Sequence, residues 1–451
     1  MGLEIDIQTL TFLMFGSLLV LLMAGLPLAF VTGGLACVFL FLLGDAQMLN
    51  IVPSRIFPLM TDYQLSAIPL FIFMASMLER AGIIGDMFDV IYKILGGLRG
   101  GLAVATIIAS TILAAMVGVI GAAVVTMGII ALPSMLKRHY DPKIAMGSIM
   151  AGGTLGILIP PSILAIIYAV VAEQSVGELF IGAVFPGLLL SGLYVLYVVM
   201  RCTINPRLGP PIPVEERISF VEKLRLLRKM SAPLILIFVV FSALFSGAAT
   251  PVEAAGIGSF GAFIVAALHG MLDWPTIREA AIGTLKASAM VIWIMFGATI
   301  FVGLYVVEGG QQFVTDALDA TGLGPWGVLI LMQIILIILG MFLDWVGILL
   351  LCVPIFVPII RGLGAAAFGF DNLDDLVLWF GVLYLVNMQM SFLSPPFGYA
   401  LFYLRGVAPP EIPMADIFRA ALPFLGLQLV GLVITMLWPE IVLWLPRLVY
   451  G

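Results

Sequence analysis

The chain has 451 residues, of which 62% are hydrophobic and only 10% are charged, whereas soluble domains carry about 25% charged residues. This composition excludes an ordinary soluble fold, because its core could not bury so much apolar surface. The net charge of -6 is spread over the chain without a basic or acidic tail, so nucleic acid is not expected as a partner.

Long apolar runs predict membrane helices, beginning near the N-terminus. The first run covers residues 10–30, and similar runs follow at residues 235–245 and 328–343. With their flanks they reach the roughly 20 residues that a helix needs to cross a hydrocarbon core about 30 Å thick. They lack the alternation typical of a barrel strand, so helices surrounded by lipid bilayer are expected. No cleavage pattern follows the first run, so we expect it to remain in the membrane.

After three expected spans, the stretch at about 102–136 predicts a re-entrant helical hairpin. Its apolar sequence is interrupted at Gly118 and Gly121 and then resumes. Neither glycine offers a side-chain oxygen, so only backbone carbonyl groups could hold a cation at this tip.

The next segment, at about 144–172, predicts a helix that is broken in its middle. Gly156 is followed by the double proline Pro160-Pro161, and proline removes a backbone donor and clashes with the preceding turn. Such a break exposes N–H groups, which favour anions, and C=O groups, which favour cations. The alternative is that the prolines merely kink a helix and that polar residues join neighbouring helices.

A proline-rich segment divides the chain into two halves. Residues 205–229 contain four prolines followed by an amphipathic basic stretch, which is typical of a linker. The first half is therefore expected at residues 1–204 and the second at residues 230–451.

The second half repeats the landmarks of the first in the same order. A second hairpin is expected at about 325–360, interrupted at Asp344 and Gly347, and a second broken helix at about 376–404. That helix contains the double proline that begins at Pro395. Two breaks at matching positions favour a ligand site over simple kinks.

Polar side chains of the second half lie in otherwise apolar segments. An intramembrane carboxylate costs at least ~2.5 kcal/mol at a helix centre, so Asp344 could bind an ion or a substrate. It could instead cap the second helix of the hairpin from the hairpin tip. In the broken helix, four polar side chains are expected to face the protein interior or a wet cavity: Asn387, Gln389, Ser391 and Ser394.

The number of spans and the loop charges predict the orientation. Each half has an odd number of crossings, so the second half must be inverted relative to the first. With the N-terminus outside, all of the 20 Lys and Arg residues lie inside except Arg55, Arg361 and Arg447, as the positive-inside rule requires. We therefore expect a multi-pass protein of the cell inner membrane with both termini in the periplasm.

These patterns together predict an all-α polytopic membrane protein with two inverted-topology repeats. Each repeat would contain three spans, a re-entrant helical hairpin, a Pro-Pro-broken span and a further span. His139 and His269 lie in separate loops without a metal-ligand or nucleophile partner nearby, so an enzyme is not expected.

Four segments carry a resemblance to a known family: residues 153–162, 249–255, 340–344 and 393–398. They resemble the large membrane subunit, the DctM family, of tripartite ATP-independent periplasmic (TRAP) transporters, and the likeness covers nearly the whole chain. The resemblance implies a sodium-coupled symporter with an elevator mechanism, in which hairpins and broken helices move against a scaffold. It also implies three partners: a small four-helix (DctQ-type) membrane subunit, a periplasmic solute-binding (DctP-type) protein and the organic acid that this protein delivers.

The first hairpin departs from the family pattern. Many members carry a Ser-Gly-Ser-like tip, whereas residues 116–123 of this chain read Met-Val-Gly-Val-Ile-Gly-Ala-Ala. In this respect the chain resembles the branch associated with 2-oxo acids, monocarboxylates and mannitol- or chloroaromatic-type substrates.

The resemblance and the two breaks together predict the site residues. Sodium is expected at Gly118, Gly121, Gly156, Pro160, Asp344, Gly347, Ser391, Pro395 and Gly398. The substrate is expected at Thr154, Pro161, Ser162, Asn387, Gln389 and Ser394. Two alternatives are a stand-alone anion symporter or exchanger of the same architecture and a non-transporting scaffold or channel subunit.

Overall fold

The computed structural model describes residues 5–118, 120–213 and 218–450, and within these ranges the chain is helical with no strand. The helices before the linker are α1 (Ile7–Met23), α2 (Leu28–Met48), α3 (Ile51–Thr61), α4 (Ala67–Arg80), α5 (Ile83–Leu95), α6 (Gly101–Val117), α7 (Ile120–Lys137), α8 (Pro142–Thr154), α9 (Ile163–Ala172) and α10 (Val176–Ile204). The later helices are α11 (Phe220–Lys229), α12 (Ser231–Phe245), α13 (Pro251–Leu268), α14 (Trp274–Val307), α15 (Gly310–Asp319), α16 (Pro325–Gly340), α17 (Trp345–Leu363), α18 (Leu373–Leu393), α19 (Tyr399–Val407), α20 (Met414–Leu437) and α21 (Glu440–Tyr450). The predicted all-α class is confirmed.

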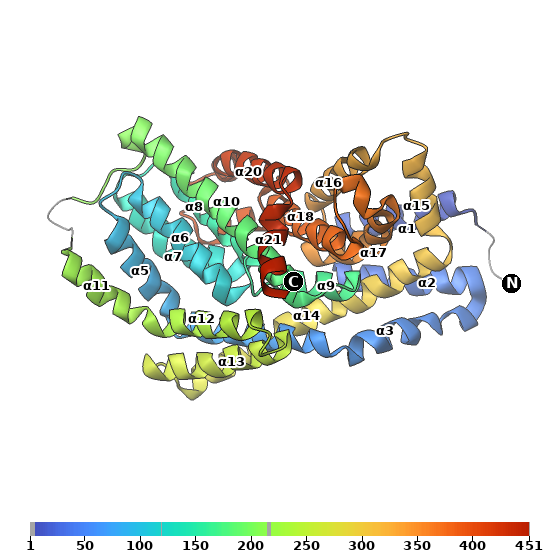
Figure 1. Ribbon diagram of the computed structural model, residues 1–451, viewed down its shortest axis with the longest axis horizontal. Helices are drawn as coiled ribbons and strands as arrows, with labels where there is room; N and C mark the ends of the chain where they lie inside the picture. The colour runs from blue at the N-terminus through green and yellow to red at the C-terminus, as the bar shows by residue number, and fades with distance from the viewer. Residues whose placement is uncertain (1–4, 119, 214–217, 451) are drawn as a thin grey trace.

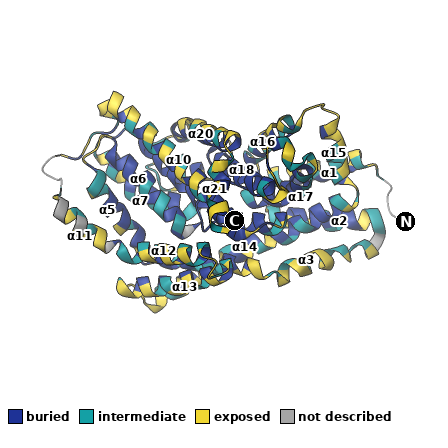
Figure 2. Cartoon of the chain, in the orientation of Figure 1, coloured by how far each residue is buried: buried dark blue, intermediate teal, exposed yellow. Residues whose placement is uncertain are grey.

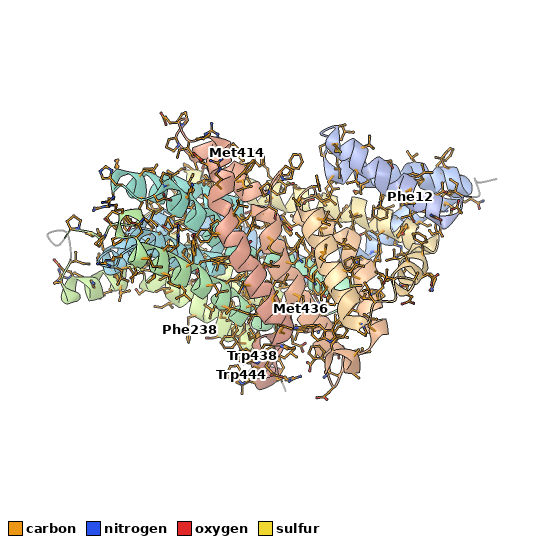
Figure 3. All side chains as sticks on the ribbon, turned by 90° about the horizontal axis from the view of Figure 1, so that it is seen from above. Phe12, Phe238, Met414, Met436, Trp438 and Trp444 are labelled. Atoms are coloured by element: carbon orange, nitrogen blue, oxygen red, sulfur yellow. The ribbon has the colours of Figure 1, made fainter. Side chains whose placement is uncertain are left out.

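Helix lengths and composition are those of a multi-pass membrane protein. Among the described residues, seven helices are long and apolar enough to cross a membrane. The pair α3 and α4, bent by 59° at their junction, passes the same test together and gives an eighth. Large apolar side chains such as Phe12, Phe238 and Trp438 are exposed around the outside (Figure 3), as expected where lipid is the solvent.

The helices form two layers (Figure 1). The long-helix layer consists of α2, α3, α4, α12, α13 and α14, and it joins the two halves of the chain because α4 packs against α13 and α2 against α14. The hairpin layer consists of α6 to α10 and α16 to α20. Burial is deepest in this second layer (Figure 2), where every residue of α18 from Leu376 to Leu393 is buried.

The two halves are interlocked within the hairpin layer. The hairpin helix α7 packs against α19 of the other half, and α17 packs against α9. One polar contact spans this second pair: Arg361, near the end of α17, donates from Nη2 to the carbonyl oxygen of Ala172 at 3.2 Å. The last turn of α9 is thus capped by a side chain from the other half.

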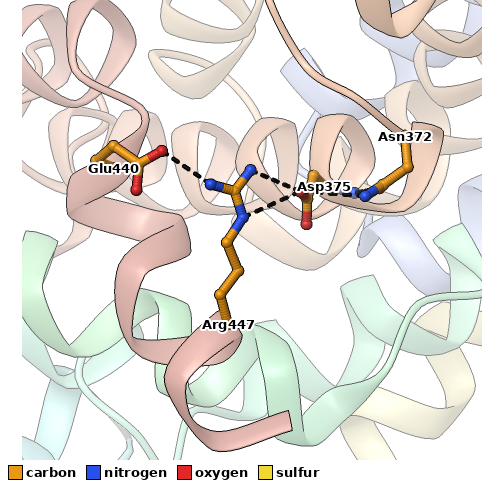
Figure 4. A network of polar contacts seen from close by, with 4 residues as sticks. All are labelled: Asn372, Asp375, Glu440 and Arg447. Carbon is orange, nitrogen blue, oxygen red and sulfur yellow. Dashed lines mark hydrogen bonds and ion pairs between the residues drawn. The ribbon is translucent and has the colours of Figure 1, made fainter. Parts of the chain in front are cut away.

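The C-terminal helix α21 fixes the start of α18 (Figure 4). Arg447 binds Asp375 through Nη2 at 2.8 Å and Glu440 through Nη1 at 2.9 Å. The hydrogen bond with Asp375 raises the pKa of Arg447 above its ordinary value. Asn372 caps α18 by accepting from the Asp375 backbone N–H at 2.7 Å.

Local capping signals explain where several helices begin. Thr250 and Glu253 form a reciprocal capping box at the start of α13, with Pro251 as its first residue. Asp273 caps α14 by accepting from the Thr276 backbone N–H at 2.8 Å. Such caps satisfy backbone donors that a helix start leaves free.

Candidate functional site

The tip of the first hairpin lies against the first helix break. α6 ends at Val117, and Gly118 follows with a left-handed backbone (φ 57°). A Cβ atom at Gly118 would lie only 2.8 Å from the carbonyl oxygen of Pro161, so the backbone conformation and the close approach both require glycine. The last carbonyl groups of α6, which a helix end leaves without helical partners, therefore lie beside the Pro161 carbonyl.

The first break separates α8 from α9. After α8, a short 3₁₀ turn covers Leu155–Ile157, which includes Gly156, and the peptide bond between Pro160 and Pro161 is cis. Ser162 caps α9 by accepting from the Ala165 N–H at 3.2 Å, and its hydroxyl donates to the Ile157 carbonyl. Ser162 thereby ties the two half-helices together across the break.

The tip of the second hairpin carries a carboxylate. Asp344 is the N-cap of α17, and its Oδ1 accepts from the Gly347 N–H at 3.2 Å. Capping, one of the two roles considered for this residue, is therefore present in the structure. A Cβ atom at Gly347 would lie 2.3 Å from the Leu28 side chain, so α17 begins directly against the start of α2.

The second break separates α18 from α19. Ser394 is the C-cap of α18. Its Oγ donates to the Met390 carbonyl at 2.7 Å, and its own carbonyl accepts from the Gly398 N–H at 2.9 Å. The Pro395-Pro396 peptide bond is cis here as well. The hydroxyl of Ser394 is thus engaged with its own helix.

The second hairpin packs tightly against α18. A Cβ atom at Gly340, the last residue of α16, would lie 1.9 Å from the Ser391 hydroxyl oxygen. Only glycine fits this contact, which places Ser391 beside the end of α16.

An open pocket of about 750 Å³ lies beside the second hairpin tip. It is bounded by residues 25–27, which connect α1 to α2, by residues 28–30 at the start of α2, by residues 289–294 of α14, and by the start of α19. Asp344 is the one charged residue among those that line it. The pocket is also lined by aromatic side chains: Phe30, Trp293, Phe342, Trp345, Phe392, Tyr399 and Tyr403.

The corresponding place at the first hairpin tip is closed. There Met116 of α6 and Pro161 of the break face Met74 of α4 and Leu236 of α12 across a crevice of only about 10 Å³. The two hairpin tips therefore differ in their contact with the long-helix layer: the first is closed against it, and the second contacts it at Leu28 but also borders a large open cavity.

Several predicted binding residues lie in the interior and do not line the open pocket. Thr154, Asn387 and Gln389 are completely buried. The Thr154 hydroxyl donates to the Ala151 carbonyl at 2.9 Å, and the Asn387 amide donates to the side-chain oxygen of Gln333 at 2.8 Å.

Gln389 differs from these two residues. Neither of its side-chain amide atoms has a hydrogen-bond partner in the structure. A buried amide of this kind calls for an ordered water or a ligand. Among the predicted substrate residues, Asn387 also has an unpartnered side-chain oxygen, but Gln389 has both of its side-chain amide atoms unpartnered.

Other expected ligands are also dispersed. A Cβ atom at Gly121 would lie 3.2 Å from the ring of Tyr403, so Gly121 contacts α19 of the other half. Among the residues proposed for sodium or substrate, Asp344 lines the open pocket. Gly118 and Pro161 meet at the other tip.

The aromatic residues of the open pocket were not predicted from the sequence. Tyr399 and Tyr403 are four residues apart on α19, a spacing that places two side chains on one face of a helix. That spacing, directly after a helix break, was a usable signal. Trp293 comes from the middle of α14, and no local pattern connects it to the hairpin tip.

The fold and the two broken helices define a polytopic membrane protein. The structure is similar to that of the YdaH transporter of Alcanivorax borkumensis, with a TM-score of 0.61 and 16% identity over 88% of this chain and 90% of that one. At this identity the similarity establishes the fold alone.

Sequence comparison identifies the family. Residues 15–441 match the profile of the tripartite ATP-independent periplasmic transporter, DctM component. The C4-dicarboxylate TRAP transporter large permease protein DctM of Pseudomonas aeruginosa is 33% identical over 92% of this chain and 93% of its own length. The ectoine/5-hydroxyectoine large permease protein UehC of Ruegeria pomeroyi is 29% identical over 97% of this chain and 99% of its own length. The chain belongs to the DctM component family of TRAP transporters and is a transporter permease subunit, not an enzyme.

Proposed function

We propose that the chain is the permease subunit of a sodium-coupled secondary transporter that imports a small organic acid across the inner membrane. A periplasmic solute-binding protein would deliver the acid, and a small four-helix membrane subunit would complete the complex. Family membership and the names of relatives that transport C4-dicarboxylates support the substrate class.

The difference between the two hairpin tips is the observation that carries the proposal. An alternating-access transporter needs a site that is closed on one side while it is open on the other. The crevice of about 10 Å³ at the first tip and the pocket of about 750 Å³ at the second fit that requirement. In this proposal the hairpin layer moves against the long-helix layer, and the two halves are inverted repeats.

The orientation follows from the loop charges. The open pocket is bounded by residues 25–27 of the connection between α1 and α2, which the positive-inside rule assigns to the cytoplasmic side when both termini are periplasmic. On this assignment the structure corresponds to the inward-facing state. Import would end with release from this pocket into the cytoplasm.

Sodium sites are proposed at the two tips because both offer oxygen atoms suited to a hard cation. At the first tip the carbonyl groups are those at the end of α6 and that of Pro161, near Gly118, Gly156 and Pro160. At the second tip the Asp344 carboxylate is joined by backbone near Gly347, Ser391, Pro395 and Gly398. Unwound carbonyls and half-helix ends hold sodium in other transporters built this way.

Charge explains why sodium and an organic anion would be coupled. A carboxylate at 4 Å from an unpaired Asp344 would be repelled by about 4 kcal/mol at an effective dielectric constant of 20. Sodium, when bound, supplies the positive charge that offsets this repulsion. The backbone N–H groups that begin α9 and α19, with Ser162 and Gln389, are proposed to meet the substrate carboxylate.

Uptake into proteoliposomes tests the proposal. The complete complex, with small subunit and binding protein, is expected to accumulate the acid that the binding protein retains, and only with an inward sodium gradient. Equal uptake with potassium would remove the coupling. Undiminished uptake without the binding protein would favour a stand-alone symporter or exchanger, and absence of saturable uptake would favour a scaffold or channel subunit.

A further inference from the structure

A second large cavity lies on the apolar side of the open pocket. It has a volume of about 760 Å³. Leu19 and Met23 of α1 line one wall, and Phe342 of the second hairpin and Phe402 of α19 line the other. None of the residues that line it carries a charge. We call it the α1 groove.

The α1 groove is continuous with the open pocket. Leu22, Gly25, Phe342, Leu343 and Tyr399 line both cavities. On this side, therefore, the space beside Asp344 is not closed by a helix of this chain but leads to the apolar outer surface. A charged solute in the pocket would lack a wall there.

We propose that one acyl chain of a bilayer phospholipid occupies the α1 groove and completes the wall of the open pocket. The side chains of Phe342, Phe397 and Phe402 are 51%, 54% and 48% exposed and point their apolar surface into this region of the membrane-facing side. The acyl chains of bilayer lipids are the apolar groups that contact such a membrane-facing surface.

The size and chemistry of the groove favour an acyl chain over other occupants. A spanning helix about 10 Å wide and about 30 Å long would fill roughly 2,400 Å³, about three times the groove volume. Ordered water needs two to four polar partners, and Tyr399 offers the one side-chain hydroxyl in the lining. An extended acyl chain needs neither the width nor the partners.

Such a chain would also respond to the state of the transporter. It would touch α1 on one side and the hairpin tip and α19 on the other. The fit of the acyl chain depends on the distance between these two walls. A lipid that binds the open state more tightly than the other states of the transporter therefore favours the open state. The groove would then act as a lipid-dependent bias on the open state.

Photolabelling of the full-length protein tests the proposal without any transport substrate, so its outcome is independent of the proposed function. The protein would be reconstituted with a phospholipid that carries a diazirine on its acyl chain, and labelled peptides would be mapped by mass spectrometry. We expect labelling of residues 342–343 and 397–402 to exceed several-fold the labelling around Phe238 and Phe260, which are even more exposed, on α12 and α13.

A filling substitution with a matched control sharpens the test. Leu19→Trp should occupy the groove and reduce its labelling several-fold, whereas Leu429→Trp, at a similarly exposed leucine of α20, should leave it unchanged. Thermal melting of both variants would show that they fold.

Three results would overturn the proposal. The first is labelling of the groove no higher than at Phe238. The second is labelling of the groove that is unaffected by Leu19→Trp in a folded variant. The third is loss of the label when the small membrane subunit is present, because a protein helix would then be the occupant.

Discussion

The two hairpin tips are built from the same parts but meet the rest of the molecule differently. At each tip a helix ends in a close glycine contact, Gly118 against Pro161 and Gly340 against Ser391, next to a helix with a double proline. The first tip is sealed against the long-helix layer, and the second opens to a cavity. The packing of a hairpin tip on its broken helix is therefore independent of how closely that tip approaches the long-helix layer.

The largest effect is expected from the carboxylate at the open tip. Asp344→Asn should reduce sodium-dependent uptake to the level of empty liposomes, because the amide carries no charge but can still cap α17. The same variant should lose any stabilisation of melting by sodium over potassium at equal ionic strength. Asp319→Asn, on the surface helix α15, is the control and should behave like the parent protein. Full sodium-dependent uptake by Asp344→Asn would show that the carboxylate serves only as a cap.

The next largest effect is expected in the reaction rates of cysteines placed at the two hairpin tips. A cysteine at Ala289, in the open pocket, should react rapidly with a polar thiol reagent from the inside, whereas one at Met74, in the closed crevice, should be protected. The three native cysteines would be replaced first. Reaction rates measured in sealed membrane vesicles of known orientation give the answer. Equal rates at the two positions would contradict the open and closed assignment.

The glycine contacts should respond differently to alanine. Gly340→Ala should destabilise the protein by about 1–3 kcal/mol through overpacking, and Ser391→Gly should restore most of the loss because the obstacle is a side chain.

The stability that Gly118→Ala loses should not be restored by a second substitution. Here the obstacle is the backbone carbonyl of Pro161, and a left-handed backbone adds about 1–2 kcal/mol for a residue with a Cβ. Gly256→Ala, where nothing lies within 4 Å of the new methyl group, is the control. Melting temperatures of the three glycine variants, and of Gly340→Ala and Gly118→Ala each combined with Ser391→Gly, measure the comparison. Rescue of Gly118→Ala by Ser391→Gly would contradict it.

The smallest effect is expected at Gln389. A buried amide without partners costs about 1–3 kcal/mol, so Gln389→Met should raise the melting temperature modestly if the amide has only a structural role. If Gln389 binds the substrate, the same variant should lose uptake while it gains stability. Measuring both quantities on one preparation decides between the two roles.

The sequence was informative about the breaks and the hairpins because their signals are local. The hairpin expected at about 325–360 corresponds to helices α16 and α17, which run from Pro325 to Leu363. The break expected at Pro395-Pro396 lies two residues beyond the end of α18. Glycine and proline interrupt helices wherever they occur, so these positions need no knowledge of the fold.

The residues that line the open pocket could not be predicted from the sequence in the same way. Asn387 was expected to bind substrate because polar side chains in a membrane face cavities or protein, and it faces protein, hydrogen-bonded to Gln333. Trp293 and Phe30 enter the pocket from distant helices. Which residues face a cavity depends on the relative position of the two layers, and no local pattern encodes that position.

The cap that Arg361 places on Ala172 bears on how the protein is made. The two residues are separated by 189 positions, so the ribosome must complete most of the second half before α9 can find its partner. Until then the last turn of α9 holds a free carbonyl in or near the bilayer, where unsatisfied backbone is costly. Chains that stop short of α17 would keep this defect permanently, which gives membrane quality-control proteases a physical feature by which to distinguish unfinished chains from complete ones.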